Sequence, residues 1–261
     1  MAGWSSTERS GTPSMNDSFR DAIASGALPN PDAVLQVRES VAGGMRAIDI
    51  APLGGIAVRI LPDRGLDLGQ AWFRGIPLAW VSSIGESPPL SELDGMAWGD
   101  AFGGGLMVTC GLRNVGMPSE GHGLHGTYAH LPAADVEIVT DAAAETITVS
   151  GTVIDDVEPR LVVRRQITVG ARTGRISIVD ETMNEGHTVA ETPLLYHCNF
   201  GDPLWATGAQ LGLAPVTTYA RDEASTDVLD GWDRPMDIAQ GPERVLEHHL
   251  DSPTAWARVS N

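Results

Sequence analysis

A two-residue alternation of apolar and polar side chains runs through the second half of the sequence, and it limits the possible folds more than any other feature. It produces four strand-like runs, at residues 135–139, 146–154, 161–169 and 175–183. Turn-forming residues separate these runs at spacings near the ~8–12 residues that are typical of β-sandwiches. No apolar pattern of helix length comes between them, which disfavours a parallel sheet built with crossover helices. The sequence therefore predicts an antiparallel, all-β fold.

The first half of the sequence shows the same period in shorter pieces. Strand-like runs at residues 34–37, 47–50 and 56–61 are separated by Gly and Pro. Residues 1–15 are rich in Ser, Thr and Gly, and we expect them to form a disordered lead-in. A chain of 261 residues is long enough for one large sandwich. We therefore expect residues 16–261 to form a single domain, with a short helix at its start.

Charge and composition argue against several classes of protein. The chain has 17 basic and 34 acidic residues, a net charge of −17, which disfavours nucleic acid and anionic membranes as partners. All 17 basic residues are arginines, and without lysine the chain cannot form a Schiff base or a lysine-containing phosphate loop, so we expect no cofactor. It has no apolar run of membrane-spanning length, no signal-peptide core, and only two cysteines, Cys110 and Cys198. These features predict a cytoplasmic protein with reduced thiols.

The segment PLLYHCNFG at residues 193–201 is expected to be a strand with two different faces. One face carries an apolar row and the other carries two polar groups: Leu194, Tyr196, Cys198 and Phe200 on the first, and Leu195, His197 and Asn199 on the second. We expect the apolar face to be buried in a core and the other face to direct His197 and Asn199 into a cleft. The alternative is that both are hydrogen-bonded residues on an ordinary sheet face, which is the commoner situation for a single histidine.

A glycine-flanked loop at residues 121–126 carries His122 and His125, which are possible partners for His197. An imidazole titrates near pH ~6.5, so it can donate or accept a proton at neutral pH. Histidines on a strand and on a facing loop suit proton transfer to a small neutral ligand. A metal site would need three or four converging ligands, and no HxH or HExxH pattern supports one. We expect no metal.

A turn with the sequence LPDRGLDLG follows the strand-like run at residues 56–61. Within it, Asp63 and Arg64 provide acceptors and donors suited to the hydroxyls of a polyol. The alternative is a solvated salt bridge in a turn. Trp72, Trp80 and Trp98 follow, and aromatic faces pack well on the C–H face of a pyranose, although most tryptophans only fill a core or loop.

Four segments in this order resemble motifs of the aldose 1-epimerases (galactose mutarotases), most closely those of a bacterial domain-of-unknown-function branch of that superfamily. They are Leu61–Asp67, Gly104–Gly116, Leu124–Gly126 and Leu194–Gly201. The resemblance covers about residues 30–261. It implies a β-supersandwich, in which two large antiparallel sheets enclose a concave carbohydrate cleft.

The resemblance also implies roles for individual residues. His197 would be the general acid that protonates the ring oxygen of a sugar, and His125 would bind and polarise sugar oxygens. Further substrate-binding positions would be Asp63, Arg64, Arg113, Asn199 and His122. The reaction would be ring opening and reclosure at the anomeric carbon, on a small-molecule carbohydrate, by a monomer or homodimer.

The sequence departs from the family pattern near its end. The general base of the mutarotases is a Glu on a strand near the C-terminus, and this sequence ends at Asn261 before a corresponding region. We therefore expect the domain to lack its C-terminal strands and the strand-like residues 255–259 to have no partner. Glu191 and Glu243 are the remaining candidates for the base. Two alternatives stay open: a non-catalytic carbohydrate-binding domain, and an isomerase or lyase acting on a keto-sugar or uronate.

Overall fold

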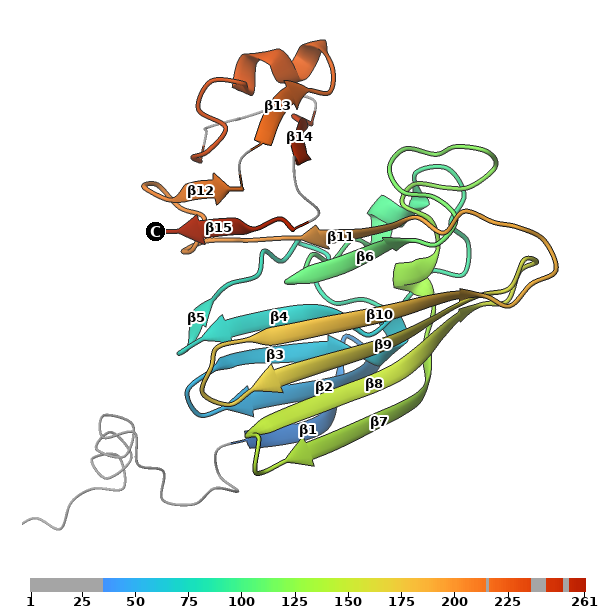
Figure 1. The fold of residues 1–261 in the computed structure, drawn as a ribbon, viewed down its shortest axis with the longest axis vertical. Coiled ribbons are helices and arrows are strands. Elements are labelled where there is room, and N and C mark those ends of the chain that lie inside the picture. The colour runs from blue at the N-terminus through green and yellow to red at the C-terminus, as the bar shows by residue number, and fades with distance from the viewer. Residues whose placement is uncertain (1–34, 215, 236–242, 251–253) are drawn as a thin grey trace, which may run out of the picture.

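The computed structural model describes residues 35–214, 216–235, 243–250 and 254–261 (Figure 1). The expected lead-in and the short helix after it lie outside the described residues. In the described part, the regular structure is antiparallel β-strand with a few short 3₁₀ turns. This confirms the predicted all-β class. None of the described helical turns is long and apolar enough to cross a membrane.

The larger of the two main sheets has seven strands in the order β1-β2-β3-β4-β6-β11, with β5 paired to β4. Their bounds are β1 Leu35–Ala42, β2 Met45–Pro52, β3 Ile56–Leu61, β4 Asp67–Phe73, β5 Ile76–Pro77, β6 Met107–Gly111 and β11 Leu194–Cys198. The sheet thus begins as a meander, and β11 joins it only after the whole smaller sheet has been completed. The predicted strand at residues 193–201 is therefore the edge strand of the larger sheet.

The smaller sheet is a four-stranded meander in the order β10-β9-β8-β7. Its strands are β7 Ala133–Asp141, β8 Thr146–Asp155, β9 Leu161–Gly170 and β10 Ile176–Asn184. Each matches one of the four alternating runs to within a few residues. The alternation is visible in the burial, because β8 is alternately half-buried and buried along its whole length.

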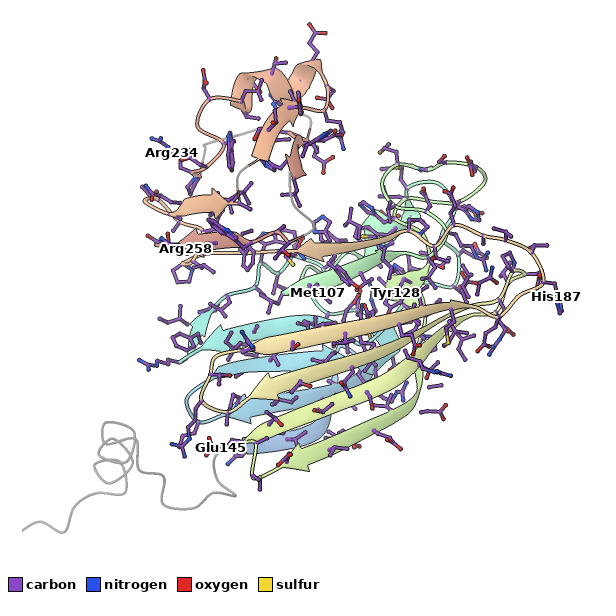
Figure 2. The ribbon with its side chains drawn as sticks, in the orientation of Figure 1. Met107, Tyr128, Glu145, His187, Arg234 and Arg258 are labelled. Carbon is purple, nitrogen blue, oxygen red and sulfur yellow. The ribbon has the colours of Figure 1, made fainter. Side chains whose placement is uncertain are left out.

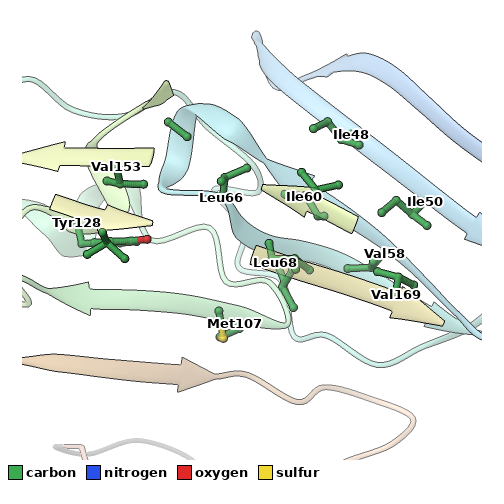
Figure 3. Close-up of a cluster of buried hydrophobic side chains, with 14 of the residues drawn as sticks. Ile48, Ile50, Val58, Ile60, Leu66, Leu68, Met107, Tyr128, Val153 and Val169 are labelled. Atoms are coloured by element: carbon green, nitrogen blue, oxygen red, sulfur yellow. The ribbon is translucent and has the colours of Figure 1, made fainter. Parts of the chain in front are cut away.

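The hydrophobic core lies between these two sheets (Figure 3). The larger sheet contributes Ile48, Ile50, Val58, Ile60 and Leu68, and the smaller sheet contributes Ile147, Val149, Val153, Leu161, Val163, Ile167 and Val169. β-branched and Leu side chains at every second position fill the space between two sheets well. The inward rows of both sheets therefore make this a sandwich.

A buried ionic network crosses this core. Arg165 on β9 takes an inward position in the apolar row and is 1% exposed. Its guanidinium donates to Asp67 at 2.8 Å on the larger sheet and to Asp180 at 2.7 and 2.9 Å on β10. It also donates to the Thr109 hydroxyl at 2.9 Å and to the Gly65 carbonyl at 3.1 Å. Arg165 therefore joins the two sheets with all five of its N–H donors engaged.

Two further pairs of short strands follow β11 in the sequence. β12 Gln210–Leu213 pairs with β15 Ala257–Ser260, and β13 Val216–Ala220 pairs with β14 Leu246–Leu250. Figure 1 shows them in orange and red beyond the β11 edge of the larger sheet. The expectation that residues 255–259 have no partner was therefore wrong, because the loop-rich region after residue 201 supplies β12.

The expected burial of the apolar face of β11 was also wrong. Tyr196 is 46% exposed and Phe200 is 40% exposed, and Cys198 is exposed as well. Only Leu194 of this row packs against the main core. The physical reason is the edge position of β11: the smaller sheet ends at β10, where Asp180 accepts a hydrogen bond from the Tyr196 hydroxyl. The alternation of apolar and polar residues correctly assigned the side chains of β11 to two faces. It did not show which of these faces is covered by other parts of the protein.

Candidate functional site

The candidate site lies on the face of the larger sheet that is turned away from the smaller one. His197 pairs with Val108 across β11 and β6, so the two side chains share a face. Val108 packs in a separate apolar cluster with Trp98 and Cys110, whereas its neighbour Met107 points into the main core. His197 therefore projects into the region covered by the loops on either side of β6.

The second histidine is held by the loop that follows β6. His125 has a left-handed backbone, with φ of 56°. Its N–H donates to the Gly116 carbonyl at 2.9 Å, and its carbonyl accepts from the Gly111 N–H at 3.0 Å. The ring Nδ1 accepts from the Gly116 N–H at 3.1 Å, so the proton of the neutral ring is on Nε2. Nε2 is thus the ring atom left for a ligand.

The two imidazoles lie next to each other within a group of aromatic rings. Their centroids are 6.1 Å apart, with the ring planes at 80°. Trp98 lies 4.6 Å from His125, and Phe102 lies 5.4 Å from His197. Trp98 and Phe102 stack at 4.7 Å, and Trp80 lies 5.8 Å from Phe102. We call these five residues the His–aromatic cluster. The expected proximity of His125 and His197 is confirmed, while their chemical roles remain predictions.

Burial and charge set the protonation of His125. Burial lowers the pKa of His125, the nearby His197 lowers it further, and the negative charge of Glu243 partly offsets these effects. His125 is therefore neutral at neutral pH. The Nδ1 atom of His197 is buried and has no hydrogen-bond partner among the described residues. The cluster thus contains an unengaged ring nitrogen on His197.

Glu243, one of the two expected candidates for a general base, is close enough to His125 for its charge to act on that ring. It precedes β14, is exposed, and accepts a hydrogen bond from Arg221 at 3.3 Å. Glu191 is exposed in the segment between β10 and β11. Of the two, only Glu243 has a described interaction with the cluster.

The turn at residues 62–64 separates the side chains of Asp63 and Arg64. Asp63 accepts hydrogen bonds from the backbone N–H of Arg46 at 2.8 Å and from its Nε at 2.7 Å. This is the solvated salt bridge that was the alternative interpretation of the motif. Arg64 points inward, is 6% exposed, and donates to the carbonyls of Ser87 at 3.4 Å and Ala101 at 3.3 Å.

Arg64 lines a small cavity of about 20 Å³, which is room for about one water molecule. Its walls are Met45, Leu61, Arg64, Asp67, Leu68, Gly85, Glu86, Ser87, Ala101, Gly103, Gly104 and Val108. Three of these wall residues adjoin the His–aromatic cluster: Val108 is the cross-strand neighbour of His197, and Ala101 and Gly103 flank Phe102 in the sequence. The cavity and the cluster are therefore adjacent parts of one region.

The other expected substrate-binding residues are engaged in holding loops. Arg113 donates to Asp155 at 2.7 Å and to the carbonyls of Val157 and Pro159, so it ties the loop after β6 to the end of β8. The Asn199 side-chain amide donates to the carbonyls of Gly105 at 2.9 Å and His197 at 3.1 Å. His122 is half-buried, and its backbone pairs with Ser119. In this structure the donors of Arg113 and Asn199 thus position the site.

Three residues of this region were not among the expected substrate-binding residues. Asp67 lies in the same turn motif, but its carboxylate binds Arg165 and Thr109. Ser87 has a buried hydroxyl with no described partner, and nothing in the sequence around it signals this. His130 accepts a hydrogen bond from the Leu90 N–H at 3.0 Å through Nδ1, while its buried Nε2 has no described partner. Burial and the charge of Arg64 lower the pKa of His130 to about 3.

A metal-binding arrangement is not part of this region. Among the described residues, no group of three or more His, Cys, Asp or Glu side chains is arranged to hold a metal ion.

With this geometry established, comparison with known proteins shows the family. Residues 42–260 match the model of "Domain of unknown function (DUF4432)". The chain belongs to this family. No curated protein matches the sequence.

Two solved structures show the relationship of the fold. One is a candidate aldose 1-epimerase from Klebsiella pneumoniae subsp. pneumoniae, with a TM-score of 0.73, 22% identity and coverage of 87% of this chain. The other is a galactose mutarotase-like protein from Clostridium acetobutylicum, with a TM-score of 0.50, 12% identity and coverage of 74% of this chain. This DUF4432 chain therefore has a galactose mutarotase-like β-sandwich fold, and the matches span 64% and 62% of the two longer chains.

Proposed function

We propose that this DUF4432 protein binds a small carbohydrate at the His–aromatic cluster and interconverts its anomers, with His197 as the general acid. The observation that carries the proposal is the 6.1 Å separation of the His125 and His197 rings beside Trp98 and Phe102. Aromatic faces can pack against the C–H face of a pyranose, while the imidazoles exchange protons with its oxygens. The fold shared with mutarotase-like structures supports the same assignment by analogy.

Anomer interconversion needs an acid and a base on the same sugar. A base removes the proton of the anomeric hydroxyl, the bond between the anomeric carbon and the ring oxygen breaks, and an acid protonates that ring oxygen. The aldehyde rotates, and the reverse steps close the ring with the hydroxyl on the other face. The position of the His197 ring beside Phe102 and His125 suits it to the acid role. His125, neutral with its proton on Nε2, is suited to donate a hydrogen bond to a sugar oxygen.

Glu243 is our candidate for the base. Its charge acts on His125, and a carboxylate there can accept the anomeric proton. A second function, carbohydrate binding without turnover, is favoured by one observation: Glu243 is exposed and already bonded to Arg221. Under the catalytic proposal Glu243 must exchange this bond for one to the sugar.

NMR exchange spectroscopy on a panel of aldoses tests the proposal. We expect the protein to accelerate interconversion and His197→Asn to lower the rate by about 100-fold or more, which is the usual contribution of a positioned acid. A matched control is His187→Asn, because His187 is exposed at the tip of the loop that follows β10 (Figure 2). Binding of aldoses without acceleration by the parent protein would select the binding function, and acceleration that survives His197→Asn would refute His197 as the acid.

A further inference from the structure

The guanidinium of Arg64 lines the cavity, is buried, and forms no ion pair with a carboxylate among the described residues. Among the described residues only two arginines are buried, Arg64 and Arg165. Arg165 has carboxylate oxygens of Asp67 and Asp180 at 2.7–2.9 Å. Arg64 has no carboxylate oxygen within 4.0 Å in the described part of the chain, and its two hydrogen bonds to carbonyls are long, at 3.3 and 3.4 Å. Most of its five donors are therefore unengaged.

The acids near Arg64 are committed to other partners. Asp67 acts on Arg64 through space, but its oxygens accept hydrogen bonds from Arg165 and Thr109. Glu86, on the cavity wall, accepts from Arg59 at 2.8 Å through one oxygen and from the Gln70 N–H at 3.2 Å through the other. Neither carboxylate is placed to pair with the Arg64 guanidinium.

A second unengaged donor lies on the same cavity wall. The hydroxyl of Ser87 is buried and has no partner among the described residues. Buried polar groups are normally hydrogen-bonded, and a charged one without a counter-ion is strongly disfavoured unless a ligand supplies it. A neutral hydroxyl would satisfy a donor but would bring no charge. A carboxylate brings both the charge and an oxygen that accepts charge-assisted hydrogen bonds from a guanidinium.

We propose that the Arg64–Ser87 cavity receives the carboxylate of an acidic monosaccharide, so that uronic acids are the preferred substrate class of the adjacent His–aromatic cluster. The assignment of a sugar substrate rests on the function proposed above. The cavity adjoins the cluster, because its wall residues Ala101 and Gly103 flank Phe102 in the sequence and its wall residue Val108 pairs with His197. The half-buried Gly103 and Gly104 form the more open side of the cavity, while Arg64 and Asp67 form its buried end. The small volume, room for about one water molecule, suits a single carboxylate oxygen better than a phosphate group.

Matched pairs of sugars test this inference. Dissociation constants would be measured by calorimetry, at one pH and ionic strength, for galacturonate against galactose, glucuronate against glucose, and galactose 6-phosphate. We expect each uronate to bind at least about tenfold tighter than its neutral aldose, as charge-assisted hydrogen bonds to a buried arginine require. The advantage should fall below about threefold in Arg64→Gln and should be partly retained in Arg64→Lys. Arg74→Gln removes an exposed arginine that does not line the cavity and should leave the advantage intact.

Each outcome has a distinct meaning. Equal affinity of the parent protein for a uronate and its aldose would overturn the inference, and so would an advantage that is the same in Arg64→Gln. Tighter, Arg64-dependent binding of galactose 6-phosphate than of galacturonate would overturn the choice of a carboxylate. If Arg64→Gln does not fold, Ser87→Ala takes its place, and an unchanged uronate advantage in that variant would count against the cavity. Uronate binding that depends on Arg64, without any anomer interconversion, would refute the proposed reaction and leave this inference standing.

Discussion

The two buried arginines of this protein have opposite surroundings, and the contrast separates what holds the fold together from what is available to a ligand. Arg165 spans the inter-sheet core with every donor engaged, by two carboxylates, a hydroxyl and a carbonyl. Among the described residues, Arg64 has only long hydrogen bonds to two carbonyls.

The two arginines also differ in how many buried polar atoms without a hydrogen-bond partner lie around them. Five buried side-chain atoms have no described partner, and four of them lie around Arg64 and the His–aromatic cluster: Ser87 Oγ, Trp98 Nε1, His130 Nε2 and His197 Nδ1. The fifth is the hydroxyl of Tyr128, whose ring packs against Arg165. Folding alone selects against unpaired buried polar groups, so a concentration of them marks a region shaped for another purpose.

The largest effect should come from removing Arg165. Arg165→Met leaves Asp67 and Asp180 buried without their counter-ion, and breaking a buried pair in this way costs about 3–5 kcal/mol. Urea denaturation would measure the loss of unfolding free energy. Arg164→Gln is the matched control, because Arg164 is the exposed neighbour on the same strand and should change stability by less than about 0.5 kcal/mol. A loss below about 1 kcal/mol in Arg165→Met would show that the network does not hold the sheets together.

The next effect is a pH dependence that originates at His130. Its pKa is lowered to about 3 in the folded protein, against about 6.5 when unfolded, so the neutral ring stabilises the fold above pH 6.5. This contribution is lost as the pH falls from 6.5 towards 3, and the loss between pH 7 and 5 is about 2 kcal/mol. His130→Asn keeps an acceptor for the Leu90 N–H but cannot titrate, so its unfolding free energy should fall less over the same interval. Parallel profiles for the two proteins would contradict this origin.

A smaller loss of stability is expected from removing the Tyr196 hydroxyl, which binds Asp180 of the Arg165 network. The hydroxyl of Tyr196 donates to Asp180 at 2.8 Å from a half-exposed side chain. Tyr196→Phe should therefore lower the unfolding free energy by about 1 kcal/mol, the usual value of one hydrogen bond. Tyr219→Phe is a suitable control because Tyr219 is equally exposed and its hydroxyl makes no hydrogen bond among the described residues. Equal effects of the two substitutions would show that the bond to Asp180 contributes nothing.

The contrast also explains how much of this molecule could be predicted from its sequence. Alternation located the strands of the smaller sheet, because each strand has one core face and one solvent face along its length. It failed for β11, where Tyr196 and Phe200 are exposed, since the cover of an edge strand depends on where the facing sheet ends. Likewise, the partner of β15 could not be inferred from local pattern, because β12 lies more than 40 residues away in the sequence.

The site was predicted in part, and for a different reason. The proximity of His125 and His197 was suggested by their residue type and by the glycine-flanked loop, and was supported by a resemblance to known motifs. No local pattern encodes it, since residues 72 positions apart are brought together by the pairing of β6 with β11 and by the loop after β6. In the motif LPDRGLD the sequence showed which residue types are present but not where their side chains point. Asp63 pairs with Arg46, and the side chain of Arg64 turns inward. The direction of a side chain in a turn is set by backbone dihedrals and distant partners, which no local pattern encodes.

The smallest expected change in stability is that of Arg64→Met, and it tests most directly whether Arg64 and Arg165 have different roles. Arg64→Met removes a buried charge that has no carboxylate partner in the described part of the chain, so the unfolding free energy should stay within about 1 kcal/mol of the parent value or rise. Urea denaturation would measure this change in unfolding free energy. A loss of 3 kcal/mol or more, comparable with Arg165→Met, would mean that Arg64 is as structural as Arg165 and that its open donors are not reserved for a ligand.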